Sequence, residues 1–459
     1  MEKRSALDQA FEQRWKTLLG EWIEFLKFPS ISAQPSYDSE CSRCAAWLVQ
    51  WLKGNGFHAW LEPTRSKPLV RAHRDGLPGA PHVLYYGHYD VQPVDPVDAW
   101  TTPPFDPVYR NDRLYARGAE DNKGQIWFTL QAMATLIAMG NPMPPIDILL
   151  EGEEECGSAG ITEWLQAHAG DIRSDILLVT DTNTVPDGRP TLVMGLRGII
   201  HATAVLQGPA YDLHSGVHGG VAPNPATGLA RLLTSLHDAQ GRIAVEGFHD
   251  GILPLSPAEK AETARARFDP EQYRHATGVP PCAGDPDRTP IERAGFLPSI
   301  DINGIHAGYS GSGIKTIIPA TATVKLTARL AAGQDPDHCL DCLCRHLERQ
   351  VPKGLTLAIT ERGIGGKGFR LAPDTPLVQQ TLMVLEKLQE GEPARLWEGA
   401  SIPVVSALQS ASGADPVLVG FGDEADRIHA PDESFSREQM RRGFVFAGLW
   451  LDAMTRGGQ

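Results

Sequence analysis

The clearest pattern in this sequence is a series of short apolar runs that alternate with longer, helix-like segments. The runs HVLYY (82–86), IDILL (146–150) and DILLV (175–179) are apolar almost throughout, as in strands that are buried on both faces. The segments 124–139 and 158–169 have the length and apolar spacing of covering helices. Strands and helices that alternate in this way predict an α/β fold with a mostly parallel sheet.

The pattern changes near residue 196. The segments 198–208 and 321–330 alternate apolar and polar residues, which indicates antiparallel strands with one covered face. The sequence between them is rich in proline and charge, which favours short helices and loops. This part of the chain therefore predicts a second, α+β domain, with its last strand in the glycine-rich stretch 354–368.

The α/β pattern returns at about residue 371, so the second domain is inserted into the first. PVLVGFG (416–422) has the pattern of a strand, and residues 436–454 have that of an amphipathic helix that opens with a capping-box spacing. We predict an α/β domain with a mixed, mostly parallel sheet covered by helices, and an inserted α+β domain. The predicted boundaries are 1–195 and 371–459 for the α/β domain, and 196–370 for the insertion.

Composition and charge narrow the classes of partner. The 459 residues carry 42 Lys and Arg against 56 Asp and Glu, and the net charge of −14 disfavours a general nucleic-acid binder. The N-terminal segment mixes charged and apolar positions at helical spacing, unlike a signal peptide. No run approaches the roughly 20 apolar residues that a membrane span requires. We therefore expect a cytoplasmic protein with neither a nucleic-acid nor a membrane partner.

Seven cysteines are an odd number and argue against a complete disulfide framework. Two groups are close in sequence, the pair Cys41 and Cys44 and the trio Cys339, Cys342 and Cys344. Both groups lie in helix-like sequence flanked by Leu and Ala. We therefore interpret them as reduced, structural thiols, with zinc binding as the alternative.

Chemically active side chains recur where predicted strands end or helices begin. GHYD places His88 and Asp90 after the first apolar run, and VTDT places Asp181 after the third. EGEEECGS places Glu153, Glu154 and Glu155 after the second. Asp121 in RGAEDNKG precedes a helix, and His429 in HAPDE lies before the last one. Any one of these stretches taken singly is more typical of a solvated loop. Together they predict a ligand site at the edge of the sheet, where repelling carboxylates need cations, most suitably zinc.

The ordered set GHYDVQP, RGAEDNKG, EGEEECGS, TDT and HAPDE resembles the M20 family of dinuclear metallopeptidases. In the inserted domain, DLHSGVHGG and NGIHAGYSGSGIKTIIPATATVKLTARL are similar to the carnosinase-like dipeptidase branch of that family. The resemblance follows the family's order over nearly the whole chain. It implies that the α/β domain is catalytic and binds metal, and that the insertion is a lid or dimerisation domain.

Carried over position by position, the resemblance implies five metal ligands. His88 and Asp181 would hold one metal, Glu155 and His429 would hold the other, and Asp121 would bridge the two. The implied cofactors are two divalent ions per subunit, zinc in the first place, with manganese or cobalt as alternatives.

The resemblance also implies roles beside the ligands. Asp90 would fix the ring of His88 through its other nitrogen. Glu154 matches the family's general base, which leaves Glu153 as the extra acid in EGEEECGS. A cis peptide is expected between Asp121 and Asn122.

The inserted domain would supply the remaining groups. His214 matches a histidine that reaches the neighbouring subunit's active site and stabilises the oxyanion, so the resemblance implies a homodimer. Arg329 resembles the residue that grips a substrate's free carboxylate, for which a planar guanidinium is suited. Asn303 and Ser401 resemble further polar contacts to the substrate. The plain alternatives are a turn histidine for His214 and a surface arginine for Arg329.

We therefore predict metal-dependent hydrolysis of dipeptides or short peptides with a free C-terminal carboxylate, through a metal-bridging water activated by Glu154. The alternatives are an amidohydrolase acting on N-acyl amino acids and a non-catalytic peptide-binding protein. The sequence leaves the side-chain preference open. Several histidines match no motif and are interpreted as structural or surface residues. They include His58, His73, His82, His201 and His249.

Overall fold

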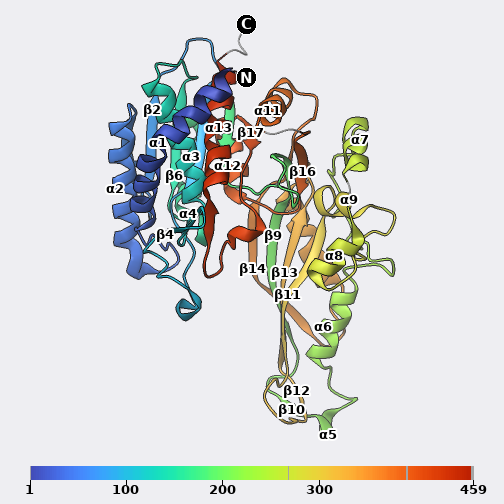
Figure 1. The fold of residues 1–459 in the computed structure, drawn as a ribbon. Helices are drawn as coiled ribbons and strands as arrows, with labels where there is room; N and C mark the ends of the chain where they lie inside the picture. Colours follow the sequence, from blue (N-terminus) through green and yellow to red (C-terminus); the bar gives the residue numbers. More distant parts are fainter. Residues whose placement is uncertain (1, 267, 389–390, 456–459) are drawn as a thin grey trace. The chain divides into compact units, whose positions relative to one another are not determined.

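The computed structural model describes residues 2–266, 268–388 and 391–455. The chain divides into two compact units, whose elements are labelled in Figure 1. Unit 1 comprises Met1–Val193, Pro373–Leu396 and Ala407–Gln459, and unit 2 comprises Met194–Ala372 and Trp397–Ser406. Nothing in the sequence pattern indicated that residues 397–406 belong with the second unit.

A mixed sheet forms the centre of unit 1, with the strand order β1-β2-β6-β3-β7-β17-β8. β3 runs parallel to β6 and β7, and β17 runs parallel to β7, whereas the outer strands pair in antiparallel fashion. All residues of β3 are buried, as its continuous apolar run predicts. The predicted mixed α/β sheet is therefore confirmed, and it is parallel in its central part only. The strands are β1 (His58–Glu62), β2 (Leu69–Arg74), β3 (Val83–His88), β6 (Ile146–Glu151), β7 (Ile176–Val179), β8 (Thr191–Leu196) and β17 (Asp415–Leu418).

Helices cover this sheet. α1 (Glu2–Leu26), α3 (Lys123–Ala138) and α13 (Arg437–Met454) pack against one another, and α2 (Asp38–Gly54) packs on β1 and β2 (Figure 1). α3 is buried over almost its whole length, because its sequence is apolar around the helix. Ser436 and Gln439 form the predicted capping box at the start of α13. Further elements are β4 (Val108–Arg110), β5 (Arg113–Tyr115), α4 (Ala159–His168), α11 (Pro376–Glu386), β16 (Ala394–Glu398), α12 (Pro403–Ser412) and β18 (Ser434–Ser436).

Unit 2 is built on an antiparallel sheet with the order β11-β13-β9-β14. In β9 and β13 buried and more exposed residues alternate, as the period-two pattern predicts. α6 and α10 pack on this sheet, and Leu206, Val324 and Leu343 are among the residues of the core. The elements are β9 (Gly198–Gln207), β10 (Leu213–His214), α5 (Ser215–His218), α6 (Pro225–Thr234), α7 (Pro257–Arg265), α8 (Pro270–Thr277), α9 (Pro290–Gly295), β11 (Ser299–Ala307), β12 (Ile317–Ile318), β13 (Thr321–Leu330), α10 (Pro336–Arg349), β14 (Thr356–Gly366) and β15 (Phe369–Arg370).

The two cysteine groups lie inside helices. Cys41 and Cys44 are buried on α2, and Cys339, Cys342 and Cys344 are buried on α10. All seven cysteines are free thiols. Within the described ranges, none of the helices is both long and apolar enough to cross a bilayer.

Candidate active site

Three parallel strands of unit 1 carry the predicted site residues to one edge of the sheet. His88 is the last residue of β3, Glu154 and Glu155 form a 3₁₀ turn after β6, and Asp181 lies two residues beyond β7. β3 is hydrogen-bonded to both of the other strands, so the carboxyl ends of all three meet at this edge. Asp121 arrives from the loop before α3.

The first group of donor atoms joins His88, Asp121 and Asp181. Nε2 of His88 lies 3.1 Å from Oδ1 of Asp121 and 3.6 Å from Oδ2 of Asp181. The amide of Asn122 donates a hydrogen bond of 2.8 Å to Oδ1 of Asp181 and a second one to the carbonyl of Thr180. The ring of His88 is buried. These contacts hold one imidazole and two carboxylates with their donor atoms within 4.8 Å of one another.

The second group shares Asp121 with the first. Nε2 of His429 lies 2.9 Å from Oδ2 of Asp121 and 3.4 Å from Oε2 of Glu155. The side-chain amide of Gln92 donates a hydrogen bond of 2.7 Å to the same oxygen of Glu155. Asp121 thus directs one carboxylate oxygen to each histidine. The Asp121–Asn122 peptide is cis, as the resemblance implied.

The three consecutive glutamates differ in their contacts. Oε2 of Glu153 accepts a hydrogen bond of 2.9 Å from the amide of Gly160 in the first turn of α4. Glu155 belongs to the second donor group. Glu154 is part of neither arrangement, and burial raises its pKa to about 7. The structure thus distinguishes the three acids, which the sequence alone left as a question of register.

Asp90 contributes in a way that the sequence did not indicate. Its two carboxylate oxygens accept hydrogen bonds from the backbone amides of Glu154 and Glu155, at 3.2 and 3.1 Å. Nδ1 of His88 makes its hydrogen bond to the backbone carbonyl of Asp90 at 3.2 Å, while the Asp90 carboxylate lies 3.4 Å away. The buried Asp90 side chain therefore fixes the 3₁₀ turn as well as flanking the histidine.

Glu433 is a buried acid that sequence reasoning missed. Its carboxylate accepts hydrogen bonds from the backbone amides of Gly118, Glu120 and Asp121, and from the guanidinium of Arg117 at 2.8 Å. This one side chain ties the loop that carries Asp121 to the segment that carries His429. The one feature of the sequence that could have pointed to Glu433 is its place as the last residue of the HAPDE motif.

Burial and hydrogen bonding shift the pKa values of the two central carboxyls of the cluster in opposite directions. Burial raises the pKa of the Asp181 carboxyl well above its ordinary value. Burial opposes charge on Asp121 too, but hydrogen bonds from His429 and His88 lower the pKa of its carboxyl. Hydrogen bonds to Asp121 and Glu155 raise the pKa of His429 to about 10. Carboxylates in excess over imidazoles, with their donor atoms held close together, are the donor set that suits a divalent cation.

The other predicted residues belong to unit 2. His214 is exposed and accepts a hydrogen bond from the amide of Gly216 through Nδ1. Arg329 is half-buried on β13, and Asn303 is exposed at an irregularity of β11. The hydroxyl of Ser401 donates a hydrogen bond of 3.2 Å to the carbonyl of Gly198. Among the described residues, the Arg329 guanidinium has no hydrogen-bond or ion-pair partner.

An α/β sheet whose carboxyl edge gathers such a donor set is typical of a metal-dependent hydrolase. A model of the family described as "Peptidase family M20/M25/M40" matches residues 84–451. The chain therefore belongs to this family of metal-dependent peptidases, which confirms the family predicted from the motifs.

The chain is similar to named peptidases over nearly its whole length. It is 27% identical to the Cys-Gly metallodipeptidase DUG1 of Candida albicans, covering 93% of this chain and 92% of that protein. It is also 27% identical to the Beta-Ala-His dipeptidase of Rattus norvegicus, covering 95% and 92%. The M20 family metallo-carboxypeptidase Sso-CP2 from Sulfolobus solfataricus has a similar structure, with a TM-score of 0.82, 29% identity, and coverage of 95% of this chain and 99% of that one.

Proposed function

We propose that this protein hydrolyses the peptide bond of dipeptides or short peptides with a free C-terminal carboxylate. The observation that carries the proposal is that Asp121 is common to two groups of metal-ligating side chains, with the buried acid Glu154 beside them. The names of similar proteins, a Cys-Gly and a Beta-Ala-His dipeptidase, support dipeptides as the substrate class. The deacylase alternative has no such support.

In this proposal each group of donors holds one divalent ion. His88 and Asp181 would hold the first ion, Glu155 and His429 would hold the second, and Asp121 would be shared by both. Mixed imidazole and carboxylate ligands favour zinc, with manganese and cobalt as alternatives. When bound, the two ions lower the pKa of a shared water and polarise the scissile carbonyl.

Glu154 acts as the general base. It takes a proton from the attacking water and gives it to the nitrogen of the leaving amine, so that the amine departs neutral. A base with a pKa near the working pH performs both transfers efficiently. The hydrogen bond between the Glu153 carboxylate and the start of α4 supports Glu154, rather than Glu153, in this role.

Unit 2 supplies substrate recognition in this proposal. The guanidinium of Arg329 binds the free carboxylate of the substrate, and Asn303 and Ser401 add polar contacts. His214 donates to the developing oxyanion in the active site of the neighbouring subunit, which makes a homodimer the working unit. The free thiols of all seven cysteines fit a reducing, cytoplasmic compartment.

The test is amino-acid release from a panel of substrates by the protein reconstituted with zinc, manganese or cobalt. The panel pairs free dipeptides, such as Cys-Gly and β-Ala-His, with N-acetyl amino acids of the same C-terminal residue. We expect cleavage of the free dipeptides, loss of activity with a chelator, and recovery on adding metal back. Cleavage of the N-acetyl compounds alone would reassign the protein to deacylation. If the metal-bound protein released no amino acid from any substrate of the panel, the result would contradict catalysis.

A further inference from the structure

A second group of metal-ligating side chains lies at the opposite end of the unit 1 sheet. His73 is on β2, Asp147 is on β6, and His82 directly precedes β3. The strands β3 and β6 are parallel, and they end at His88 and Glu151 in the edge that carries the candidate active site. About five residues of extended strand, roughly 17 Å, therefore separate the two places. The second group is too far away to take part in peptide hydrolysis.

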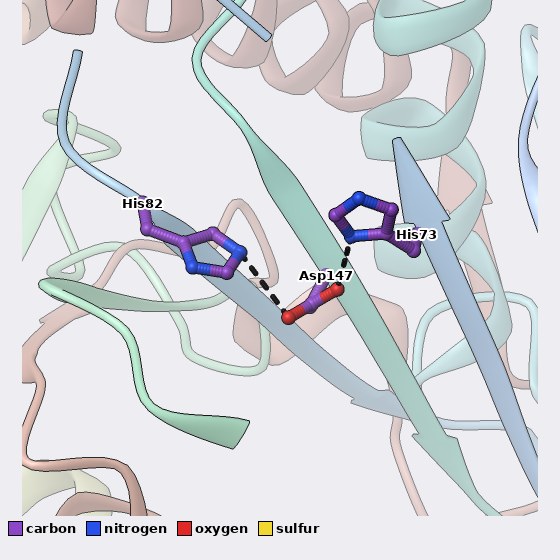
Figure 2. Close-up of side chains that lie close together, drawn as sticks. All are labelled: His73, His82 and Asp147. Atoms are coloured by element: carbon purple, nitrogen blue, oxygen red, sulfur yellow. Dashed lines mark hydrogen bonds and ion pairs between the residues drawn. The ribbon is translucent and has the colours of Figure 1, made fainter. Parts of the chain in front are cut away.

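Both histidine rings approach the carboxylate of Asp147, each at its own oxygen. Figure 2 shows the carboxylate of Asp147 between the two imidazole rings. Nδ1 of His73 lies 2.7 Å from Oδ1 of Asp147, and Nε2 of His82 lies 3.1 Å from Oδ2. The two rings are nearly perpendicular, at 85°, with their centroids 6.4 Å apart. One donor atom from each residue lies within 4.8 Å of the other two.

The backbone holds these side chains in place before any ion arrives. His73 and Asp147 are direct partners in the antiparallel β2–β6 ladder, so their side chains point to the same face. His82 is held by Asp175, whose carboxylate accepts from the His82 amide at 2.7 Å and whose own amide donates to the His82 carbonyl at 2.9 Å. The group therefore combines three strands without relying on a mobile loop.

Two details of the group point to a ligand. Nε2 of His82 is shielded from solvent and makes no hydrogen bond to the described residues, and it lies 3.1 Å from Oδ2 of Asp147 as an ion-pair contact. Nε2 of His73 lies 3.2 Å from the carboxylate of Asp75, the arrangement that orients a histidine whose other nitrogen binds metal. Donor atoms around a tetrahedral ion with bonds of about 2.0–2.1 Å lie about 3.3 Å apart. Each histidine nitrogen lies 2.7 or 3.1 Å from one of the two oxygens of Asp147.

We propose that His73, His82 and Asp147 bind a divalent ion of the zinc type, separate from the metals of the active site. Two imidazoles and one carboxylate are ligands that zinc accepts and that magnesium and calcium disfavour. The ion ties the start of β3 to β2 and β6, so its role is to stabilise the sheet that carries the active site. Water completes its coordination, because the group is partly open to solvent.

The test counts zinc in the full-length protein. Wild type, His82→Ala and Asp147→Asn are equilibrated with the same buffered free Zn²⁺, passed through a desalting column and analysed for zinc per chain. His275→Ala, which removes an exposed histidine on α8 of unit 2, is the matched control. We expect wild type and His275→Ala to hold one zinc per chain more than the two site variants. A thousandfold excess of Mg²⁺ should leave this difference unchanged.

Turnover and melting temperature complete the test. We expect the site variants to keep wild-type turnover, which also shows that they are folded, and to lose several degrees of the zinc-dependent rise in Tm. If His82→Ala does not fold, the zinc content of Asp147→Asn decides between the outcomes, because this substitution keeps the size of the side chain and so disturbs the packing least. Equal zinc content in all four proteins would overturn the proposal and leave an ion pair between Asp147 and two histidines. Displacement of the extra zinc by Mg²⁺ would overturn it as well.

Discussion

The two units of this protein hold their candidate functional residues in opposite ways. In unit 1 the metal-ligating side chains contact one another, as Asp121 does with both His88 and His429, and all of them except His429 are buried or half-buried. In unit 2, His214 and Asn303 are exposed, and Arg329 has an open guanidinium. The difference indicates that unit 1 fixes the geometry of the reaction before substrate binds. Under the proposed function, the residues of unit 2 gain their partners only when a substrate or a second subunit binds.

The largest effect is expected from replacing the general base Glu154 in unit 1. Replacing Glu154 by Gln removes the proton acceptor, so turnover should fall by about 10²–10⁴-fold. Metal content should stay at the wild-type value, because Glu154 is outside both donor groups. Initial rates on a cleaved dipeptide, with metal analysis of the same samples, measure both quantities.

Glu153→Gln is the matched control for this substitution. Its amide oxygen still accepts the hydrogen bond from Gly160, so most of the turnover should remain. If Glu153→Gln abolished activity while Glu154→Gln kept it, the assignment within the three glutamates would be wrong by one residue.

The second effect tests whether unit 2 acts across a subunit interface. His214→Ala should lower turnover by about 10²–10³-fold, the usual loss when one oxyanion donor is removed. If His214 serves the partner's site, mixing His214→Ala with Glu154→Gln subunits creates hybrid dimers with one intact site. After complete subunit exchange, activity should recover to about one quarter of wild type, because half of the dimers are hybrids and each has one working site.

Native mass spectrometry supplies the control for the mixing experiment, since it reports the fraction of hybrid dimers directly. Hybrids that form without any recovery of activity would mean that His214 acts within its own subunit or not at all. Full activity of an isolated wild-type monomer would exclude the interface role.

The third effect concerns the open guanidinium of Arg329. Arg329→Ala should raise KM for a free dipeptide by about 10–100-fold, because a charge-assisted hydrogen bond to a carboxylate is worth about 1.5–3 kcal/mol. A dipeptide with an amidated C-terminus should bind wild type and variant equally weakly. Lys325→Ala, an exposed cation on the same strand, is the control and should leave KM unchanged. A KM effect that is the same for the free and amidated peptides would rule out carboxylate recognition.

The smallest effect concerns the buried carboxyl of Asp426 in unit 1 and the pH dependence of stability that its burial produces. Burial raises the pKa of Asp426 to about 7, although Arg113 and the side-chain amide of Gln439 contact its carboxylate. In the unfolded chain this group has an ordinary pKa near 3.9, so the folded state binds the extra proton between about pH 4 and 7. Its contribution to stability is therefore greatest at low pH and is lost as the pH rises through 7.

Asp426→Asn stays neutral at every pH and removes this dependence. In the metal-free protein, the Tm of the variant relative to wild type should rise by about 2–4 °C between pH 5 and pH 8, as about 1 kcal/mol would produce. Glu424→Gln, an exposed neighbour, should follow the wild-type curve. If Asp426→Asn ran parallel to wild type over this range, the carboxyl would be ionised throughout.

The sequence by itself determined the classes of element and the places of the chemistry. The continuous apolar runs predicted β3, β6 and β7. A strand that is buried on both faces is apolar at successive positions, so a run without alternation indicates such a strand. His88, Asp121, Asp181 and His429 were found because each stands where a strand ends or a loop enters a helix, which is a local property of the chain. The capping box of α13 is local in the same sense.

The tertiary structure alone decided which polar groups share a partner. Glu433 lies more than 300 positions from the amides that it accepts from, and no periodic pattern marks it. Asp90 was predicted to orient His88, but which amides its carboxylate caps depends on where the turn after β6 lies against β3. His73 and Asp147 become neighbours only through the register of β2 on β6, and a shift of one residue would turn them to opposite faces. Local periodicity records which face of an element is buried, whereas contacts between distant polar groups depend on strand order and register, which only the assembled sheet provides.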